Sequence, residues 1–394
     1  MRTDAVRDEV EPSTGTDTKI TQDMIDAMRA TCMQEITPRY FFNRYATFDT
    51  LRHWVEGLGD PNPLFHDEDY ASRTRWRTLI NHPTFYFSTA MFSSPMGLPG
   101  VHGLHSGTDW EFIKPLRSGD EVKAQECLFD IVEKPSSFAG RMFQQTWRST
   151  YSNQRGETTA ICYSHAMRTE RDTAKDRGKY ADVRAHRWDD ADLAEIDATY
   201  ERELTSVCRG SRTRYWDDVV VGEAIDPIVR GPLTVTDIIA FKTGWGWTPF
   251  CRTGWYAWDY RQRHPKAYPK DPLLNIPDVP ERVHWEDRFA VAIGAPGPYD
   301  YGPQRISWTA TAVTHWCGDD GWLKRLNVQV RRFNILGDAT WVRGEVVDKE
   351  IVRDECLVHL AVRCVNQSGI DSLIGRATVV LPRRNVEHSV GIPD

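Results

Sequence analysis

The sequence lacks long apolar runs, paired cysteines and basic blocks. No stretch of the 394 residues approaches the ~18 apolar residues of a spanning helix, so we expect no membrane insertion. The eight cysteines contain no Cys-x-x-Cys pair, which indicates neither a zinc site nor a disulfide framework and favours reduced thiols. A net charge of −7 without a basic block argues against a dedicated nucleic-acid-binding protein. With its polar beginning, the chain is expected to be cytoplasmic.

The composition is that of a globular protein. Hydrophobic residues make up 40% and charged residues 27% of the chain, which excludes a disordered or collagenous class. At ~150 residues per domain, two to three domains are expected. The 15 tryptophans are unusual, and such wide rings either line an apolar ligand cavity or fill the core.

A charged, apolar-poor stretch divides the chain into two halves of similar size. We predict a polar tail (1–30), an N-terminal domain (31–170), a charged linker (171–213) and a C-terminal domain (214–385) with an inserted loop (246–283). The insertion is rich in proline and aromatic residues and is too long for an ordinary connection, so we expect it to be functional.

The two halves repeat one pattern. Residues 48–58 place Leu51, Trp54, Val55 and Leu58 on one helical face, and a second helix is expected from Thr234. Each half then closes with strands and a hairpin turn. Helix first and strands afterwards, twice over, predicts two α+β units whose helices pack on their own sheets. If two such sheets lie side by side, each covers one edge strand of the other.

Specific motifs follow each first helix. The first half reads Gly-Asp-Pro-Asn-Pro-Leu-Phe-His from Gly59 to His66, with Ala71 five residues later. The second half has His284 six residues before Ala290, and Tyr-Gly-Pro before a central helix expected at about Gln304 to Trp316. In combination these residues resemble the tandem hotdog of the MaoC-like dehydratase and (R)-specific enoyl-CoA hydratase family. The resemblance covers nearly all of residues 40–382 and implies a double hotdog, two antiparallel sheets each wrapped around a central helix.

Neither half carries the complete family signature. Phe65 stands where the family has its catalytic histidine, and His66 lies one residue late. The second half lacks the Asp-x-Asn-Pro element, although Asp278 precedes His284 by six residues, the interval that separates Asp60 from His66.

Hydration of an enoyl thioester needs proton-transfer groups around one water and a donor for the enolate oxygen. The resemblance therefore implies catalytic roles for Asp60, His66, His284 and Asp278, and an oxyanion or substrate-binding role for Gly302 and Asn62. Structural alternatives stand beside these roles: a turn acid at Asp60, a solvated helix start at His66 and a core histidine at His284. The working site lies in the second half, in the first half, or between them with Asp60 facing His284. We favour His284 as the base and Asp60 as the acid.

The leading functional hypothesis is a hydratase or dehydratase of an enoyl-CoA thioester with a bulky acyl group. No metal or redox cofactor is expected, and CoA enters only as part of the substrate. The alternatives are a hotdog acyl-CoA thioesterase and a non-catalytic acyl-CoA-binding scaffold subunit. The expected partners are an acyl-CoA and, through the hotdog sheets, a second copy of the chain, with neither nucleic acid nor membrane.

Overall fold

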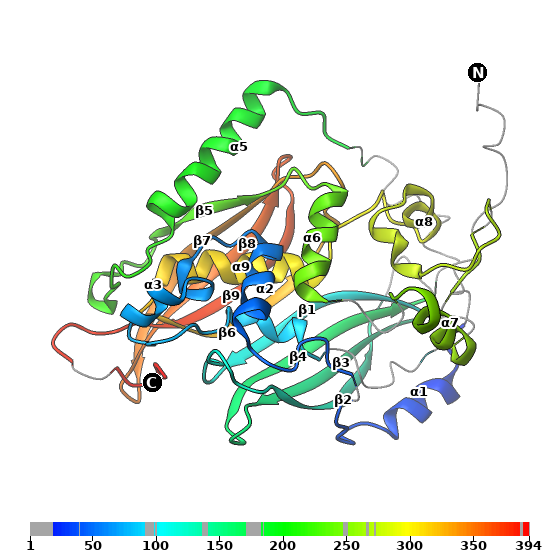
Figure 1. The fold of residues 1–394 in the computed structure, drawn as a ribbon, viewed down its shortest axis with the longest axis horizontal. Coiled ribbons are helices and arrows are strands. Elements are labelled where there is room, and N and C mark those ends of the chain that lie inside the picture. The colour runs from blue at the N-terminus through cyan, green and yellow to red at the C-terminus, as the bar shows by residue number, and fades with distance from the viewer. Residues whose placement is uncertain are drawn as a thin grey trace.

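A computed structural model shows one large antiparallel sheet with helices packed on it (Figure 1). It describes residues 19–38, 40–90, 98, 101–135, 141–170, 183, 185–246, 251–264, 268–271, 273–386 and 389–393. The nine strands have the spatial order β2-β3-β4-β1-β6-β9-β8-β7-β5. Their bounds are β1 His102–Phe112, β2 Lys123–Glu133, β3 Met142–Ser152, β4 Thr158–Thr169, β5 Ala224–Arg230, β6 Trp322–Val330, β7 Thr340–Val352, β8 Glu355–Asn366 and β9 Asp371–Val380.

The sheet is a double hotdog, as predicted. Strands β1–β4 come from the N-terminal half and β5–β9 from the C-terminal half. The halves join where β1 pairs with β6, from Gly107 opposite Gln329 to Glu111 opposite Arg325. Each half-sheet therefore hides one edge inside the chain.

The predicted central helix of the second half is α9, Gly302–Cys317. All its residues from Pro303 to Cys317 are buried, and it lies across the C-terminal strands (Figure 1). The comparable place in the first half holds the short 3₁₀-helix η2, Pro83–Ser88. Only the second half therefore presents a long buried helix to a site, among the residues described.

The two predicted opening helices pack against each other. They are α2, Phe48–Leu58, and α6, Val235–Trp245. A Cβ at Gly244 would lie 2.3 Å from the carbonyl oxygen of His53, and one at Gly57 would lie 3.0 Å from that of Ala240. The two glycines thus allow these helices to approach closely.

The remaining helices pack around this core. They are α1 Gln22–Arg29, η1 Pro63–Phe65, α3 Glu68–Arg73, α5 Asp190–Arg202, η3 Glu203–Val207, η4 Trp216–Asp218, α7 Gly254–Arg263, η6 Pro280–His284 and α8 Asp287–Ala292.

One predicted boundary is wrong, the end of the polar tail. The polar tail does not reach residue 30, because α1 buries Ile25 and Met28 in a cluster with Leu128, Phe143 and other residues of the N-terminal half. The linker contains α5, which buries Ile196. Residues 1–18, 171–182 and 184, and Trp247, Phe250, Pro265 and Pro272 of the insertion, lie outside the described residues.

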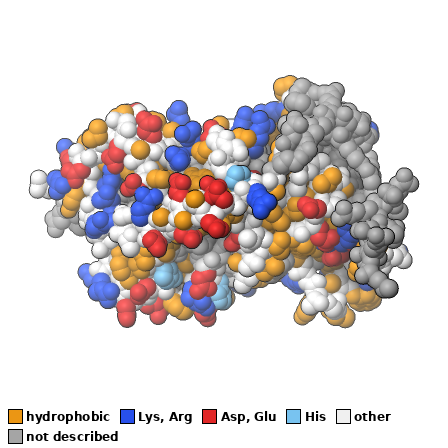
Figure 2. Space-filling view, turned by 90° about the horizontal axis from the view of Figure 1, so that it is seen from above, with side chains coloured by type: hydrophobic (Ala, Val, Ile, Leu, Met, Phe, Trp, Pro, Cys, Tyr) orange, Lys and Arg blue, Asp and Glu red, His pale blue; other side chains and the backbone are white. Residues whose placement is uncertain are grey.

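The described part of the chain has neither a membrane-spanning helix nor a metal-binding cluster. No helix there is long and apolar enough to cross a membrane. No group of three or more His, Cys, Asp or Glu residues is arranged there to hold a metal ion. On the face shown in Figure 2, basic and acidic side chains are interspersed.

The seam between the halves gives the first prediction. Gly107 has φ +148°, and a Cβ there would lie 2.2 Å from the carbonyl oxygen of Val328 on β6. Gly119 also has a positive φ, +95°, but nothing lies within 4 Å of its Cβ position. We expect Gly107→Ala to lower the free energy of unfolding by about 3 kcal/mol and Gly119→Ala by about 1 kcal/mol, measured by urea denaturation. Equal effects would show that the seam tolerates a side chain.

Candidate functional site

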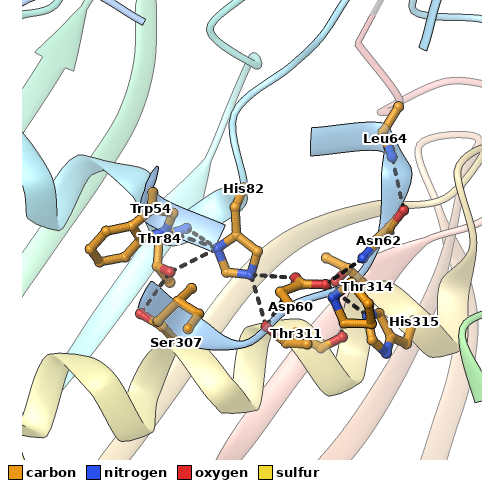
Figure 3. A network of polar contacts seen from close by, with 12 residues as sticks. Trp54, Asp60, Asn62, Leu64, His82, Thr84, Ser307, Thr311, Thr314 and His315 are labelled. Atoms are coloured by element: carbon orange, nitrogen blue, oxygen red, sulfur yellow. Dashed lines mark hydrogen bonds and ion pairs between the residues drawn. The ribbon is translucent and has the colours of Figure 1, made fainter. Parts of the chain in front are cut away.

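Asp60 lies at the centre of a buried polar network that joins the two halves (Figure 3). It follows α2 directly, after Gly59 has ended that helix in the left-handed conformation. Its Oδ1 accepts a hydrogen bond from His315 Nε2 at 3.0 Å, and its Oδ2 accepts one from Thr311 Oγ1 at 3.1 Å. His82 Nε2 lies 3.6 Å from the same Oδ2. The side chains of Asp60, His82 and His315 are fully buried.

The partners of Asp60 come from different elements. Thr311 and His315 are four residues apart on α9 and therefore share one helical face. His82 precedes η2, and its Nδ1 accepts from Trp54 Nε1 at 3.4 Å and from the backbone N–H of Thr84 at 3.2 Å. Because Nδ1 accepts, the proton of neutral His82 is on Nε2, which faces Asp60 and Thr311.

A second ion pair extends the network to the linker. Glu203 accepts two hydrogen bonds from Arg230 of β5, both of 2.7 Å. Glu203 Oε1 also lies 3.8 Å from His315 Nδ1. Asp60, His315, Glu203 and Arg230 thus form a buried series of acidic and basic groups from four chain segments.

Two pKa shifts follow from this geometry. Burial raises the pKa of the Asp60 carboxyl, but the nearby His315 and His82 together lower it by more. The pKa of Asp60 therefore lies below its ordinary value. Burial lowers the pKa of His82 to about 4, although the charge of Asp60 opposes this shift. Asp60 is therefore ionised and His82 neutral near pH 7.

A small cavity lies beside this network. Asn62 Oδ1 accepts from the backbone N–H of Leu64 at 3.1 Å, and its own N–H donates to Asp60 Oδ1 at 2.9 Å, so the side chain caps η1. A neighbouring cavity lined by Asn62, Phe65, Thr314 and other residues measures about 30 Å³. At ~10–15 Å³ per water, it holds about two waters and no acyl chain.

The predicted pair of Asp60 and His66 is not formed. His66 Nε2 lies 3.3 Å from the carbonyl oxygen of Pro61, and none of its hydrogen bonds within the described chain reaches Asp60. Phe65 packs edge-on against His82 at 5.3 Å between ring centroids. The ring at the family's histidine position is thus part of the core, and His82 and His315 are the histidines beside the acid.

His284 lies in the second half, at the approach to α9. Its Nδ1 donates to the carbonyl oxygen of Tyr299 at 2.7 Å, and its ring packs on Tyr301 at 3.8 Å between centroids. The Nε2 atom therefore remains an acceptor, and no described residue hydrogen-bonds to it. Burial lowers the pKa of His284 to about 4, so the imidazole is neutral near pH 7.

Asp278 is wrong as the acid beside His284. Its carboxyl is 45% exposed and lies 3.5 Å from Arg282 Nε. The acid whose charge acts on His284 is Glu281, which the sequence prediction missed. Its position, three residues before the histidine, is where the first half has Asn62 three residues before Phe65. When Phe65 is aligned with His284, Glu281 corresponds to Asn62 and Val279 corresponds to Asp60. This alignment of the two halves could have identified Glu281 from the sequence.

Gly302, which was predicted to lie just before the central helix, is the first residue of α9 and directly follows Tyr301. A Cβ at Gly302 would lie 2.5 Å from His105 Nδ1 of β1, so glycine is needed for this close approach. Its backbone N–H belongs to the first turn of a buried 16-residue helix, where the helix dipole favours negative charge.

The composite site of Asp60 and His284 is not formed. Asp60 contacts Thr311 and His315, whereas His284 packs on Tyr301. Ten residues separate Tyr301 from Thr311, about 15 Å along a helix. The Asp60 network continues along α9 to Ser307 through His82 and Thr84, whereas His284 contacts Tyr301, just before the helix begins.

The buried network predicts strong coupling between the halves. Asp60→Asn and His315→Gln should each lower the free energy of unfolding by about 3 kcal/mol, because each leaves a buried partner unpaired. The free energy of unfolding of the double variant should fall by at least about 1 kcal/mol less than the sum of the two single losses. His66→Gln is the control, with a loss below about 0.5 kcal/mol in urea denaturation. Additive losses would contradict a direct interaction.

The low pKa of His82 predicts a pH-dependent stability. The unfolded chain binds a proton at this histidine below its ordinary pKa of 6.5, whereas the folded chain binds it only below about 4. Stability therefore falls as the pH falls from 6.5 to 4, by up to about 3 kcal/mol. His82→Asn should reduce that fall, measured by urea denaturation at several pH values. An unchanged slope in the variant would contradict the assignment.

Comparisons with known proteins agree with this fold. The family model of the FAS1-like dehydratase domain region matches residues 45–162. A probable enoyl-CoA hydratase alpha subunit of Thermomonospora curvata is 29% identical over 130 residues, 28% of this chain and 40% of that protein. The match thus spans less than half of that relative.

Solved structures extend the likeness to almost the whole chain. A MaoC-like dehydratase superposes with a TM-score of 0.61 at 16% identity, covering 90% of this chain and 99% of that one. A Mycobacterium tuberculosis protein described as having a double hotdog fold superposes with a TM-score of 0.51 at 12% identity, covering 88% of this chain and 95% of that one. At these identities the superpositions show the fold. The chain therefore has the double hotdog fold, and its N-terminal half is similar in sequence to the FAS1-like dehydratase domain region.

Proposed function

We propose that the protein is a hydratase or dehydratase of enoyl-CoA thioesters whose working site is at the beginning of α9. One observation carries the proposal: His284 donates through Nδ1 to Tyr299, which leaves Nε2 as a neutral acceptor, and the ring packs on Tyr301, the residue that precedes Gly302 and α9. A base and an oxyanion donor are the two groups that this reaction needs. The likeness to an enoyl-CoA hydratase alpha subunit supports the same reaction class.

In the proposed reaction, water adds across the carbon–carbon double bond. His284 Nε2 takes a proton from the water as the water oxygen bonds to the β-carbon. The electron pair of the double bond moves to the α-carbon and the thioester oxygen, where the N–H of Gly302 stabilises the negative charge. The imidazolium then gives its proton to the α-carbon. Dehydration is the reverse, and neither direction needs a metal or a redox cofactor.

A bulky acyl group remains part of the proposal. The insertion carries Trp255, Tyr256 and Trp258 on α7, which are 65%, 61% and 49% exposed. Flat aromatic side chains on this segment are suited to cover an apolar acyl group.

Two features favour a non-catalytic acyl-CoA-binding subunit as the second candidate. Val279 occupies the place of the family acid in the second half, and the first half encloses its own acid in a network with room for about two waters. A thioesterase, the third candidate, would release free thiol.

The test compares two histidine variants on a panel of 2-enoyl-CoA thioesters. His284→Gln should lower kcat/KM at least about 100-fold, because general base catalysis contributes that much. His66→Gln should retain most of the activity. Loss of the enoyl-thioester absorbance reports hydration, and release of free thiol reports hydrolysis. Full activity of a folded His284→Gln protein would contradict the proposal, and binding without either reaction would favour the scaffold.

A further inference from the structure

We infer that Glu281, held by Lys242 and Tyr301, is the carboxylate partner that poises His284 for proton transfer in place of the missing family acid. The inference rests on the proposed function. Glu281 acts through His284, so it is a positioning residue.

Three side chains converge on one oxygen of Glu281. Lys242 Nζ of α6 lies 3.2 Å from Oε2, Tyr301 Oη donates to Oε2 at 3.3 Å, and Cys251 Sγ donates to it at 3.0 Å. These contacts come from α6, the insertion and the residue before α9. Glu281 is therefore fixed by three segments at the place where His284 packs on Tyr301.

The cluster is costly to bury. The side chain of Lys242 is fully buried and that of Glu281 is 12% exposed. Lys242 Nζ also lies 4.3 Å from the ring centroid of Trp245 and 5.3 Å from that of Tyr301. Because such a buried pair contributes little net stability compared with apolar residues, its presence beside His284 indicates a role in the site.

The other charged residues of this segment face elsewhere. Arg282 Nη1 donates to Asp271 at 2.9 Å, and its guanidinium lies over the ring of Phe289. Among the described residues, the titratable groups around His284 are thus Glu281, Lys242, Tyr299, Tyr301 and Cys251. The negative charge of Glu281 raises the pKa of His284 and the positive charge of Lys242 lowers it, although burial is the largest influence.

The arrangement explains how a histidine in an apolar pocket accepts a proton. When Nε2 takes a proton from water, the imidazolium needs a nearby negative charge. Glu281 supplies it, and Tyr301 carries the contact from the carboxylate to the face of the imidazole. Lys242 Nζ, 3.2 Å from Glu281 Oε2, is the cationic partner of that carboxylate.

The experiment measures the pKa of His284 in two ways. NMR titration of its ring, assigned by loss of the signal in His284→Gln, needs no substrate. The acidic limb of the kcat/KM profile reports the same group in the working enzyme, because only the neutral imidazole accepts a proton. Glu281→Gln should lower the pKa of His284 by about one unit and kcat/KM at least about 10-fold. Lys242→Met should raise that pKa and move the acidic limb to higher pH.

Asp278→Asn is the matched control, since it neutralises an exposed carboxylate three residues before Glu281 in the sequence. Thermal melts check that each variant is folded, and Lys242→Met tests the inference separately if Glu281→Gln does not fold. If Glu281→Gln and Asp278→Asn titrate and turn over like the wild type, the inference is overturned. If the wild type turns over no thioester, the proposed function fails, while the NMR titration still decides whether Glu281 and Lys242 act on His284.

Discussion

The contact between Asp60 and His315 is the interaction on which the arrangement of the two halves depends. It joins residues 255 positions apart, one behind the first helix of the N-terminal half and the other on the central helix of the C-terminal half. A buried carboxylate needs hydrogen-bond or ionic partners. The position of α9 is therefore fixed by the hydrogen bonds from His315 and Thr311 to Asp60. This position of α9 in turn places Tyr301 and Gly302 at the opposite end of the helix, beside His284.

The two halves have consequently taken different roles from the same pattern. In the first half, a phenylalanine at the histidine position and two buried histidines around Asp60 make a closed network. In the second half, the histidine is kept, the acid position is Val279, and the insertion and α6 bring Cys251 and Lys242 to Glu281. The motif that looks most complete in the sequence therefore belongs to the joint between the halves.

The sequence predicted the elements well and the site only in part. The apolar periodicity of residues 48–58 and the Tyr-Gly-Pro at the start of α9 were sufficient to predict these two helices, because helix formation depends on residues that are close in the sequence. The pairing of Asp60 with His315 and His82 was not predicted, because no local pattern links residues so far apart. Glu281 was missed because it stands at the asparagine position of the motif, and Asp278 was chosen for its interval although its side chain faces solvent.

The central claim is that chemistry belongs to the beginning of α9 and that Asp60 holds the halves together. A crystal structure with a bound 3-hydroxyacyl-CoA tests it most directly. The account predicts the thioester oxygen within hydrogen-bond distance of the Gly302 N–H and the 3-hydroxyl on His284 Nε2, with the Asp60 network unchanged. A thioester bound at Asp60 and His82, with His284 away from the ligand, would contradict it.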